Sequence, residues 1–112
     1  MHTVVETPEY LKASAKAGMT DDERAAAVEA VALNPTAGDL IAGGGGIRKV
    51  RVAGRGKGKS GGYRVVTYYL DEGQPVFLLT VISKGQRANL TDGQMQALKT
   101  IAKDEKRIRG SR

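Results

Sequence analysis

The fold is decided by the stretch from Ile47 to Ser83, which reads IRKVRVAGRGKGKSGGYRVVTYYLDEGQPVFLLTVIS. It contains three segments rich in β-branched and aromatic residues, at Ile47–Ala53, Gly62–Leu70 and Val76–Ser83, and each segment predicts a strand. Residues 71–75, Asp-Glu-Gly-Gln-Pro, predict a tight hairpin turn between the last two strands. We therefore expect an antiparallel sheet at the centre of the fold.

The residues before this stretch predict one more strand and two helices. Residues 2–6 are rich in β-branched side chains and favour a strand. Residues 7–17 open with a threonine cap and a proline and predict a helix that Gly18 ends. Thr20-Asp-Asp-Glu23 is a capping box, and it predicts a second helix over 21–33. Residues 36–46 then predict a loop.

The residues after it predict one helix, from the capping box Thr91-Asp-Gly-Gln94 to about Arg107. Its apolar residues recur at helical spacing, at Met95, Leu98, Ile101 and Ala102. The order of elements predicts an α+β fold, in which an antiparallel sheet packs against two N-terminal helices and carries a C-terminal helix. At 112 residues we expect a single domain, 1–112.

Composition excludes several kinds of site. The chain has no cysteine and one histidine, His2, so we expect no disulfide, no Cys nucleophile, no histidine base, no metal and no cofactor. We expect His2, beside the start methionine, to be frayed. No apolar run is long enough to span a bilayer, so we expect a cytoplasmic protein without a membrane partner.

Charge is unevenly distributed along the chain. Residues 1–45 hold three basic and seven acidic side chains, a net charge of −4, whereas residues 46–112 hold fifteen basic and five acidic ones, a net charge of +10. Seven basic and no acidic residues lie between Ile47 and Arg64. Such a field attracts polyanions, of which phosphate backbones are the commonest. The alternative is a solvated basic loop that keeps the chain soluble.

Residues 53–60, Ala-Gly-Arg-Gly-Lys-Gly-Lys-Ser, resemble the phosphate-binding loop of nucleotide hydrolases but have Ala53 where the first glycine belongs. That loop must open a helix, whereas a strand follows here. We therefore interpret this segment as a hairpin loop whose lysines reach phosphates.

Side chains alternate along a strand, so Lys49 and Arg51 share the exposed face if the neighbouring valines face the core. Arg64 opens the next strand. We expect these three to converge with two basic residues that follow the third strand, so that the candidate catalytic residues are Lys49, Arg51, Arg64, Lys84 and Arg87. The candidate RNA-binding residues are Arg48, Arg55, Lys57, Lys59 and Tyr63.

Such a patch suits RNA cleavage without a metal, because the 2′-hydroxyl of the substrate supplies the nucleophile. Arginine and lysine stabilise the charge that grows on the phosphate, and a lysine among other cations has a lowered pKa and can act as a base. The spacing alone does not separate cleavage from simple nucleic-acid binding.

The ordered motifs Asn34–Asp39, Gly45–Arg51, Gly56–Gly62, Arg64-Val-Val and Phe77–Val81 resemble RelE/HigB-like toxins of type II toxin–antitoxin systems, in the RelE/ParE superfamily. The HigB-type subgroup has the same Gly-Lys-Gly-Lys-Ser-Gly-Gly loop. The resemblance runs from Val4 to about Lys103. It implies the RelE-like fold, an endoribonuclease that cleaves messenger RNA in the ribosomal A site, and inhibition of translation. It also implies a cognate helix-turn-helix antitoxin, which links the toxin indirectly to operator DNA.

The family's basic residues fall on Lys49, Arg51 and Arg64 and, after the last strand, on Lys84 and Arg87. The chain departs from the pattern at Ile82, where the subgroup often has a tyrosine, and at Gly85-Gln86, where acidic residues are usual. No tyrosine follows Tyr69, so the acid and the base of cleavage stay unassigned. Two alternatives remain open, a gyrase-poisoning toxin of the same fold and a non-catalytic nucleic-acid-binding regulator.

Overall fold

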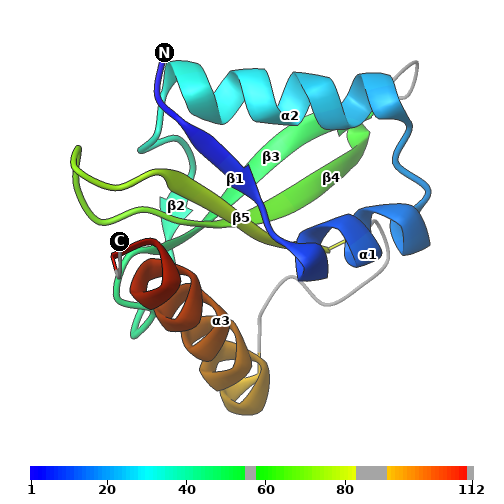
Figure 1. Ribbon diagram of the computed structural model, residues 1–112. Helices are drawn as coiled ribbons and strands as arrows, with labels where there is room; N and C mark the ends of the chain where they lie inside the picture. The colour runs from blue at the N-terminus through cyan, green and yellow to red at the C-terminus, as the bar shows by residue number, and fades with distance from the viewer. Residues whose placement is uncertain (55–57, 83–90, 111–112) are drawn as a thin grey trace.

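A computed structural model describes residues 1–54, 58–82 and 91–110. Its elements follow one another as a short strand, two helices, four strands and a final helix (Figure 1). Their bounds are β1 Val4–Glu6, α1 Pro8–Ala17, α2 Asp21–Leu33, β2 Asp39–Leu40, β3 Ile47–Gly54, β4 Gly58–Tyr68, β5 Val76–Ile82 and α3 Asp92–Gly110. The predicted α+β class is confirmed.

The strands form one sheet in the order β1-β5-β4-β3-β2. Pairs β2–β3, β3–β4 and β4–β5 are antiparallel, as expected for strands joined by hairpins and a short loop. The first strand differs, because β1 runs parallel to β5, with Val4 opposite Val76. A parallel pair needs a long connection, and the chain between β1 and β5 includes two helices and three strands. The sheet is therefore mixed rather than wholly antiparallel.

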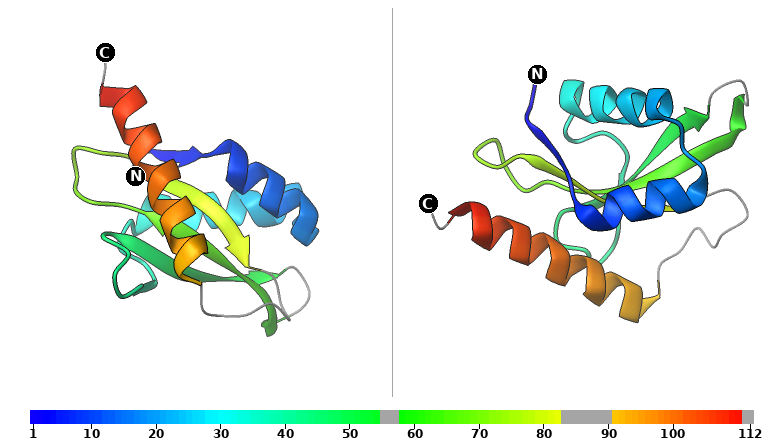
Figure 2. Two further views of the ribbon diagram at one scale, coloured as in Figure 1. Left: turned by 90° about the horizontal axis from the view of Figure 1, so that it is seen from below. Right: turned by 45° about the vertical axis from the view of Figure 1, so that its right-hand side comes forward.

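Helices cover both faces of the sheet. Helices α1 and α2 lie on one face and α3 lies across the other (Figures 1 and 2). One apolar cluster joins Tyr10, Ala27 and Val31 of the first two helices to the sheet. A second cluster joins Leu98 and Ala102 of α3 to the opposite side of the same strands. The protein thus has two cores separated by one sheet.

The helix boundaries follow the predicted signals. Thr7 caps α1 by accepting a hydrogen bond from the Tyr10 backbone N–H, and Gly18 ends the helix in the left-handed conformation. Both bonds of the capping box at Thr20 and Glu23 are formed at the start of α2. The second box is formed as well, with Thr91 and Gln94 each donating a backbone N–H to the other's side chain. The four predicted helix-core positions of α3 all pack in the second cluster.

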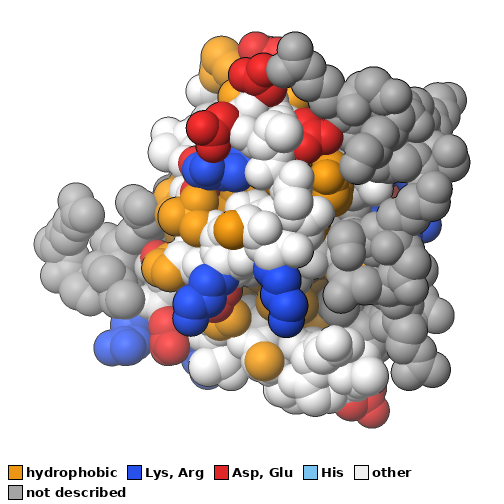
Figure 3. Space-filling view, turned by 90° about the vertical axis from the view of Figure 1, so that its right-hand side faces the viewer, with side chains coloured by type: hydrophobic (Ala, Val, Ile, Leu, Met, Phe, Trp, Pro, Cys, Tyr) orange, Lys and Arg blue, Asp and Glu red, His pale blue; other side chains and the backbone are white. Residues whose placement is uncertain are grey.

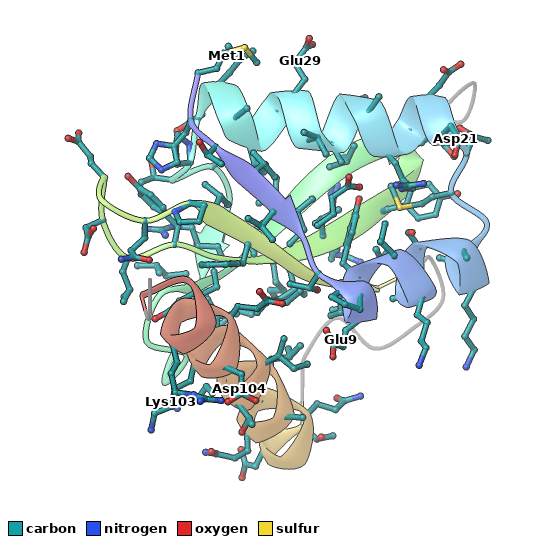
Figure 4. All side chains as sticks on the ribbon, viewed as in Figure 1. Met1, Glu9, Asp21, Glu29, Lys103 and Asp104 are labelled. Carbon is teal, nitrogen blue, oxygen red and sulfur yellow. The ribbon has the colours of Figure 1, made fainter. Side chains whose placement is uncertain are left out.

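The N-terminus is anchored rather than frayed, which corrects the expectation for His2. The backbone N–H of His2 donates to the Ala32 carbonyl at 2.8 Å, and its ring Nε2 lies 2.6 Å from the Gln74 carbonyl oxygen. The imidazole also packs edge-on against Tyr69, with ring centroids 5.1 Å apart. These contacts fix Met1 beside the end of α2, as labelled in Figure 4.

The predicted loop at 36–46 contains strand β2, which sequence reasoning missed. Gly38, at a φ of +89°, brings the chain so close to β3 that a Cβ there would clash with the Lys49 carbonyl. Only glycine permits this approach, after which Asp39 pairs with Lys49 and Leu40 with Arg48. Within the described part of the chain, no helix is long and apolar enough to cross a membrane.

Candidate nucleic-acid interface

Alternation along β3 separates its basic residues from its valines, as predicted. Val50 and Val52 are buried in the cluster beneath α1 and α2. Ile47, which shares the other face with Lys49 and Arg51, is buried beneath α3. Lys49 is half-buried and Arg51 is exposed, so this end of the face is covered less completely than the part around Ile47.

Strand β4 adds a third cation to the same face. Arg64 pairs directly with Arg51 on one side and with Ile82 of β5 on the other. Lys49 pairs with Val66, which lies in the core beneath α3. Because residues directly opposite in an antiparallel pair point to the same side, the structure gathers Lys49, Arg51 and Arg64. We call these three residues the basic face.

Two like charges stand directly opposite each other in this face. An arginine opposite an arginine destabilises an antiparallel pair. Among the residues that the structure describes, neither Arg51 nor Arg64 makes an ion pair with an acidic side chain. The apolar clusters on both sides of the sheet hold the strands in this register. An anion that contacted both guanidinium groups would offset this repulsion.

Two of the predicted RNA-binding residues lie on the opposite face of the sheet. Tyr63 is only 5% exposed and packs in the cluster beneath α1 and α2. Arg48 shares that side with Val50, and its Nη1 donates to the Tyr69 carbonyl at 3.4 Å. The physical reason is the period of two, which places both residues opposite the basic face. Neither Tyr63 nor Arg48 belongs to the basic face.

Of the remaining predicted site residues, only Lys59 belongs to the part of the chain that the structure describes. Lys84 and Arg87, as well as Arg55 and Lys57, lie outside the described residues. Lys59 lies in β4 by its backbone. The strand that begins at Gly58 also agrees with the interpretation of residues 53–60, because a phosphate-binding loop would have opened a helix there.

The tyrosine on this side of the sheet is a poor candidate for a base. Tyr68 packs against Phe77, with ring centroids 6.2 Å apart. Burial raises the pKa of its phenol, and the negative charge of Asp71 raises it further. The phenol is therefore protonated at neutral pH. No group of three His, Cys, Asp or Glu residues within 1–54, 58–82 and 91–110 could hold a metal ion.

A groove beside the basic face was not predicted. It has a volume of about 580 Å³ and lies between β2 with its following turn, β3 and the first half of α3. In the left view of Figure 2 the segment around β2 runs beside the beginning of α3. Lys49 lines the groove and also belongs to the basic face. Sequence reasoning missed it because its walls meet only after β2 pairs with β3, for which Gly38 was the one local signal.

Acidic and basic residues occupy different parts of the surface. The first turn of α2 carries Asp21, Asp22 and Glu23, and red side chains gather at the top of Figure 3, where that helix begins. Arg24 of the same helix is engaged with Glu6 at 3.2 Å and with Asp21 at 3.4 Å. The acidic end of α2 and the basic face therefore lie on opposite sides of the sheet.

A comparison of the sequence with models of known protein families finds one match. The profile described as RelE toxin of the RelE / RelB toxin-antitoxin system matches residues 3–111, nearly the whole chain. The match includes the basic face, the groove and all three helices.

Proposed function

This chain belongs to the RelE toxin family, and from that premise we propose that it cuts messenger RNA in the ribosomal A site and so inhibits translation. As a family member it is a toxin of a toxin–antitoxin system with a cognate antitoxin as partner. The proposal adds the reaction, the substrate and the residues that act on it.

The observation that carries the proposal is the arginine pair. Arg51 and Arg64 lie directly opposite each other, beside Lys49, on a sheet face that α3 leaves partly open. A fold that served only stability would gain by removing one of the two like charges. A phosphate between them converts this repulsion into two charge-assisted contacts.

The chemistry uses the substrate's own nucleophile. The 2′-oxygen attacks the adjacent phosphorus, the bond from phosphorus to the 5′-oxygen breaks, and a 2′,3′-cyclic phosphate and a 5′-hydroxyl result. The proton leaves the 2′-oxygen and another reaches the 5′-oxygen. Negative charge on the phosphoryl oxygens is greatest in the transition state, where the fixed guanidinium groups of Arg51 and Arg64 stabilise it most strongly.

The partners follow from this activity. Ribosome and messenger RNA are the target, and the protein acts in the cytoplasm, where translation takes place. The antitoxin neutralises the toxin and, as a helix-turn-helix protein, carries it to operator DNA. A small helix-turn-helix reading frame beside the gene is the expected genomic arrangement.

The test measures message cleavage in a reconstituted translation system by primer extension. The wild-type protein should cut translated messages, and Arg64→Ala should slow cleavage about 100- to 1,000-fold, the cost of removing one transition-state donor. Lys12→Ala, an exposed change on α1, is the matched control and should cut at the wild-type rate.

The outcomes separate the competing functions. Growth arrest with intact messages would overturn the proposal, and double-strand DNA breaks would favour the gyrase poison. Unaltered translation together with salt-dependent RNA binding would favour the non-catalytic regulator.

A further inference from the structure

The groove beside the basic face has the size and the lining of a ligand site. Its volume of about 580 Å³ lies within the roughly 300–1,000 Å³ of small-molecule pockets. Three elements form it, and the argument uses Asp39, Ile41, Lys49, Met95, Gln96 and Lys99 of its lining. No single helix end or loop creates this groove.

The lining combines an apolar floor with a polar rim. Ile41 and Met95 are partly buried against the cluster beneath α3. Their packing holds them in place, so they offer a fixed apolar surface to a ligand. Around them stand an amide, Gln96, and charged side chains of both signs, which are Asp39, Asp92, Lys49 and Lys99. A flat ring with hydrogen-bonding edges and an attached phosphate matches this combination, because the ring covers the floor while its edge meets the rim.

The groove continues the basic face without a break. Lys49 pairs with Asp39 in the sheet and is two residues from Arg51 on the same side of β3, a spacing of about 7 Å. An RNA strand whose cleaved phosphate sits between Arg51 and Arg64 therefore brings a neighbouring nucleotide to the groove. Lys99 lies on the far wall, where it can meet the next phosphate.

We propose that this groove holds the base next to the cleaved phosphate and that Asp39 selects a base with an exocyclic amino group. The inference rests on the proposed function, whose substrate it makes more specific. An ionised carboxylate only accepts hydrogen bonds, so it binds bases that donate from an exocyclic amino group, which are guanine, adenine and cytosine. Uracil has no exocyclic amino group and presents carbonyl oxygens at the corresponding positions, so its ring N–H is the one donor it offers and Asp39 should bind it more weakly.

The test uses short single-stranded RNAs with 2′-O-methyl groups, which bind but cannot be cleaved. Four tetranucleotides differ only in one base, and fluorescence anisotropy gives their dissociation constants for the purified full chain. With the wild-type protein, the uracil-containing RNA should bind about tenfold more weakly than the best of the other three. With Asp39→Asn the difference should shrink to about twofold, because an amide both donates and accepts.

A lysine pair on α3 provides the matched control. Lys99→Ala should weaken the binding of all four RNAs about equally, as expected for a phosphate contact. Lys103→Ala removes the same charge one turn later, at an exposed position that does not line the groove, and should leave all four constants unchanged. Circular dichroism of each variant verifies that α3 is folded.

The result distinguishes this inference from the proposed function. If the wild type cuts messages and Arg64→Ala does not, while uracil binds as well as the other bases, the groove inference alone is overturned. Equal base preference in the wild type and in Asp39→Asn overturns it too. So does a loss of antitoxin binding in Lys99→Ala without a change in RNA binding, which would assign the groove to the antitoxin. If the base preference is found but no message is cut, the groove stands and the nuclease proposal fails.

Discussion

The two faces of the central sheet are built from the same strands and serve different ends. Along β3 the valines face α1 and α2, and the cations of the basic face point the other way. The first face is closed, because Val65 and Leu78 of the sheet and Tyr10 of α1 are all fully buried where the helices pack on it. The second face is closed only where α3 crosses it, over Ile47, Phe77 and Leu79.

Under the proposed function, this difference separates the residues that stabilise the fold from the residues that act on RNA. The closed face fixes the register of β3 and β4, and that register sets Arg51 opposite Arg64. The like-charged pair on the half-open face depends on this register, because two facing arginines repel each other and stay together only on a rigid support. Substitutions on the two faces should therefore differ in their effects on the free energy of unfolding and on RNA binding, even at neighbouring positions.

The largest expected effect comes from a pair of consecutive leucines in β5. Leu78 and Leu79 are both fully buried, but Leu78 packs beneath α1 and α2 whereas Leu79 packs beneath α3. Either change to alanine should lower the free energy of unfolding by about 2–5 kcal/mol, measured by urea denaturation. Leu79→Ala should in addition alter RNA binding by the folded protein, because it loosens the support of α3 and of the groove.

Leu78→Ala is the internal control for that claim. It should leave the dissociation constant for RNA unchanged under conditions where both variants are fully folded. If both variants weaken RNA binding alike, the two faces are not independent and the comparison fails.

The next largest effect is a loss of folding stability at alkaline pH, which arises from Tyr10 on the closed face. Tyr10 is fully buried, and its hydroxyl has no hydrogen-bond partner within the described residues. Burial first, and then the charge of Glu6, raise its pKa from 10.0 to about 12, against an opposing effect of Arg24. Since the folded pKa lies above the unfolded one, the stabilisation is complete below pH 10 and is lost between pH 10 and 12.

Tyr10→Phe should remove this loss, which amounts to about 2–3 kcal/mol for a shift of this size. All other residues are the same in both proteins, so the difference between the two unfolding curves isolates the tyrosine. At pH 7 the variant should be about as stable as the wild type, because the removed hydroxyl has no partner. Parallel curves from pH 8 to 12 would contradict this account.

Much of this division was predictable from the sequence. The period of two in Ile47–Ala53 correctly separated Val50 and Val52 from Lys49 and Arg51, and the capping boxes at Thr20 and Thr91 correctly located two helix starts. These features depend on residues close together in the chain. The parallel pairing of β1 with β5 was not predicted, because nothing local to Val4 indicates a partner at Val76.

The site was predictable to a smaller extent. Placing Lys49, Arg51 and Arg64 together required only alternation and hairpin pairing, both of which short segments indicate. Tyr63, also predicted to bind RNA, lies on the face opposite Arg64, because adjacent residues in a strand point to opposite faces. The groove depends on Gly38, β2 and α3 meeting in three dimensions, and no pattern in the sequence brings these segments together.

The smallest expected effect tests the like-charge pair itself. Arg51→Gln removes one of two facing guanidinium groups and should raise the free energy of unfolding by a few tenths of a kcal/mol, while RNA cleavage falls. The gain should disappear in 1 M salt, where the screening length is about 3 Å. Arg48→Gln is the matched control, because it removes the same charge from the same strand but breaks the bond to the Tyr69 carbonyl, and should give no gain. A loss of stability in Arg51→Gln would mean that the arginine pair supports the fold, and it would contradict a role of this pair in binding a phosphate at a cost in stability.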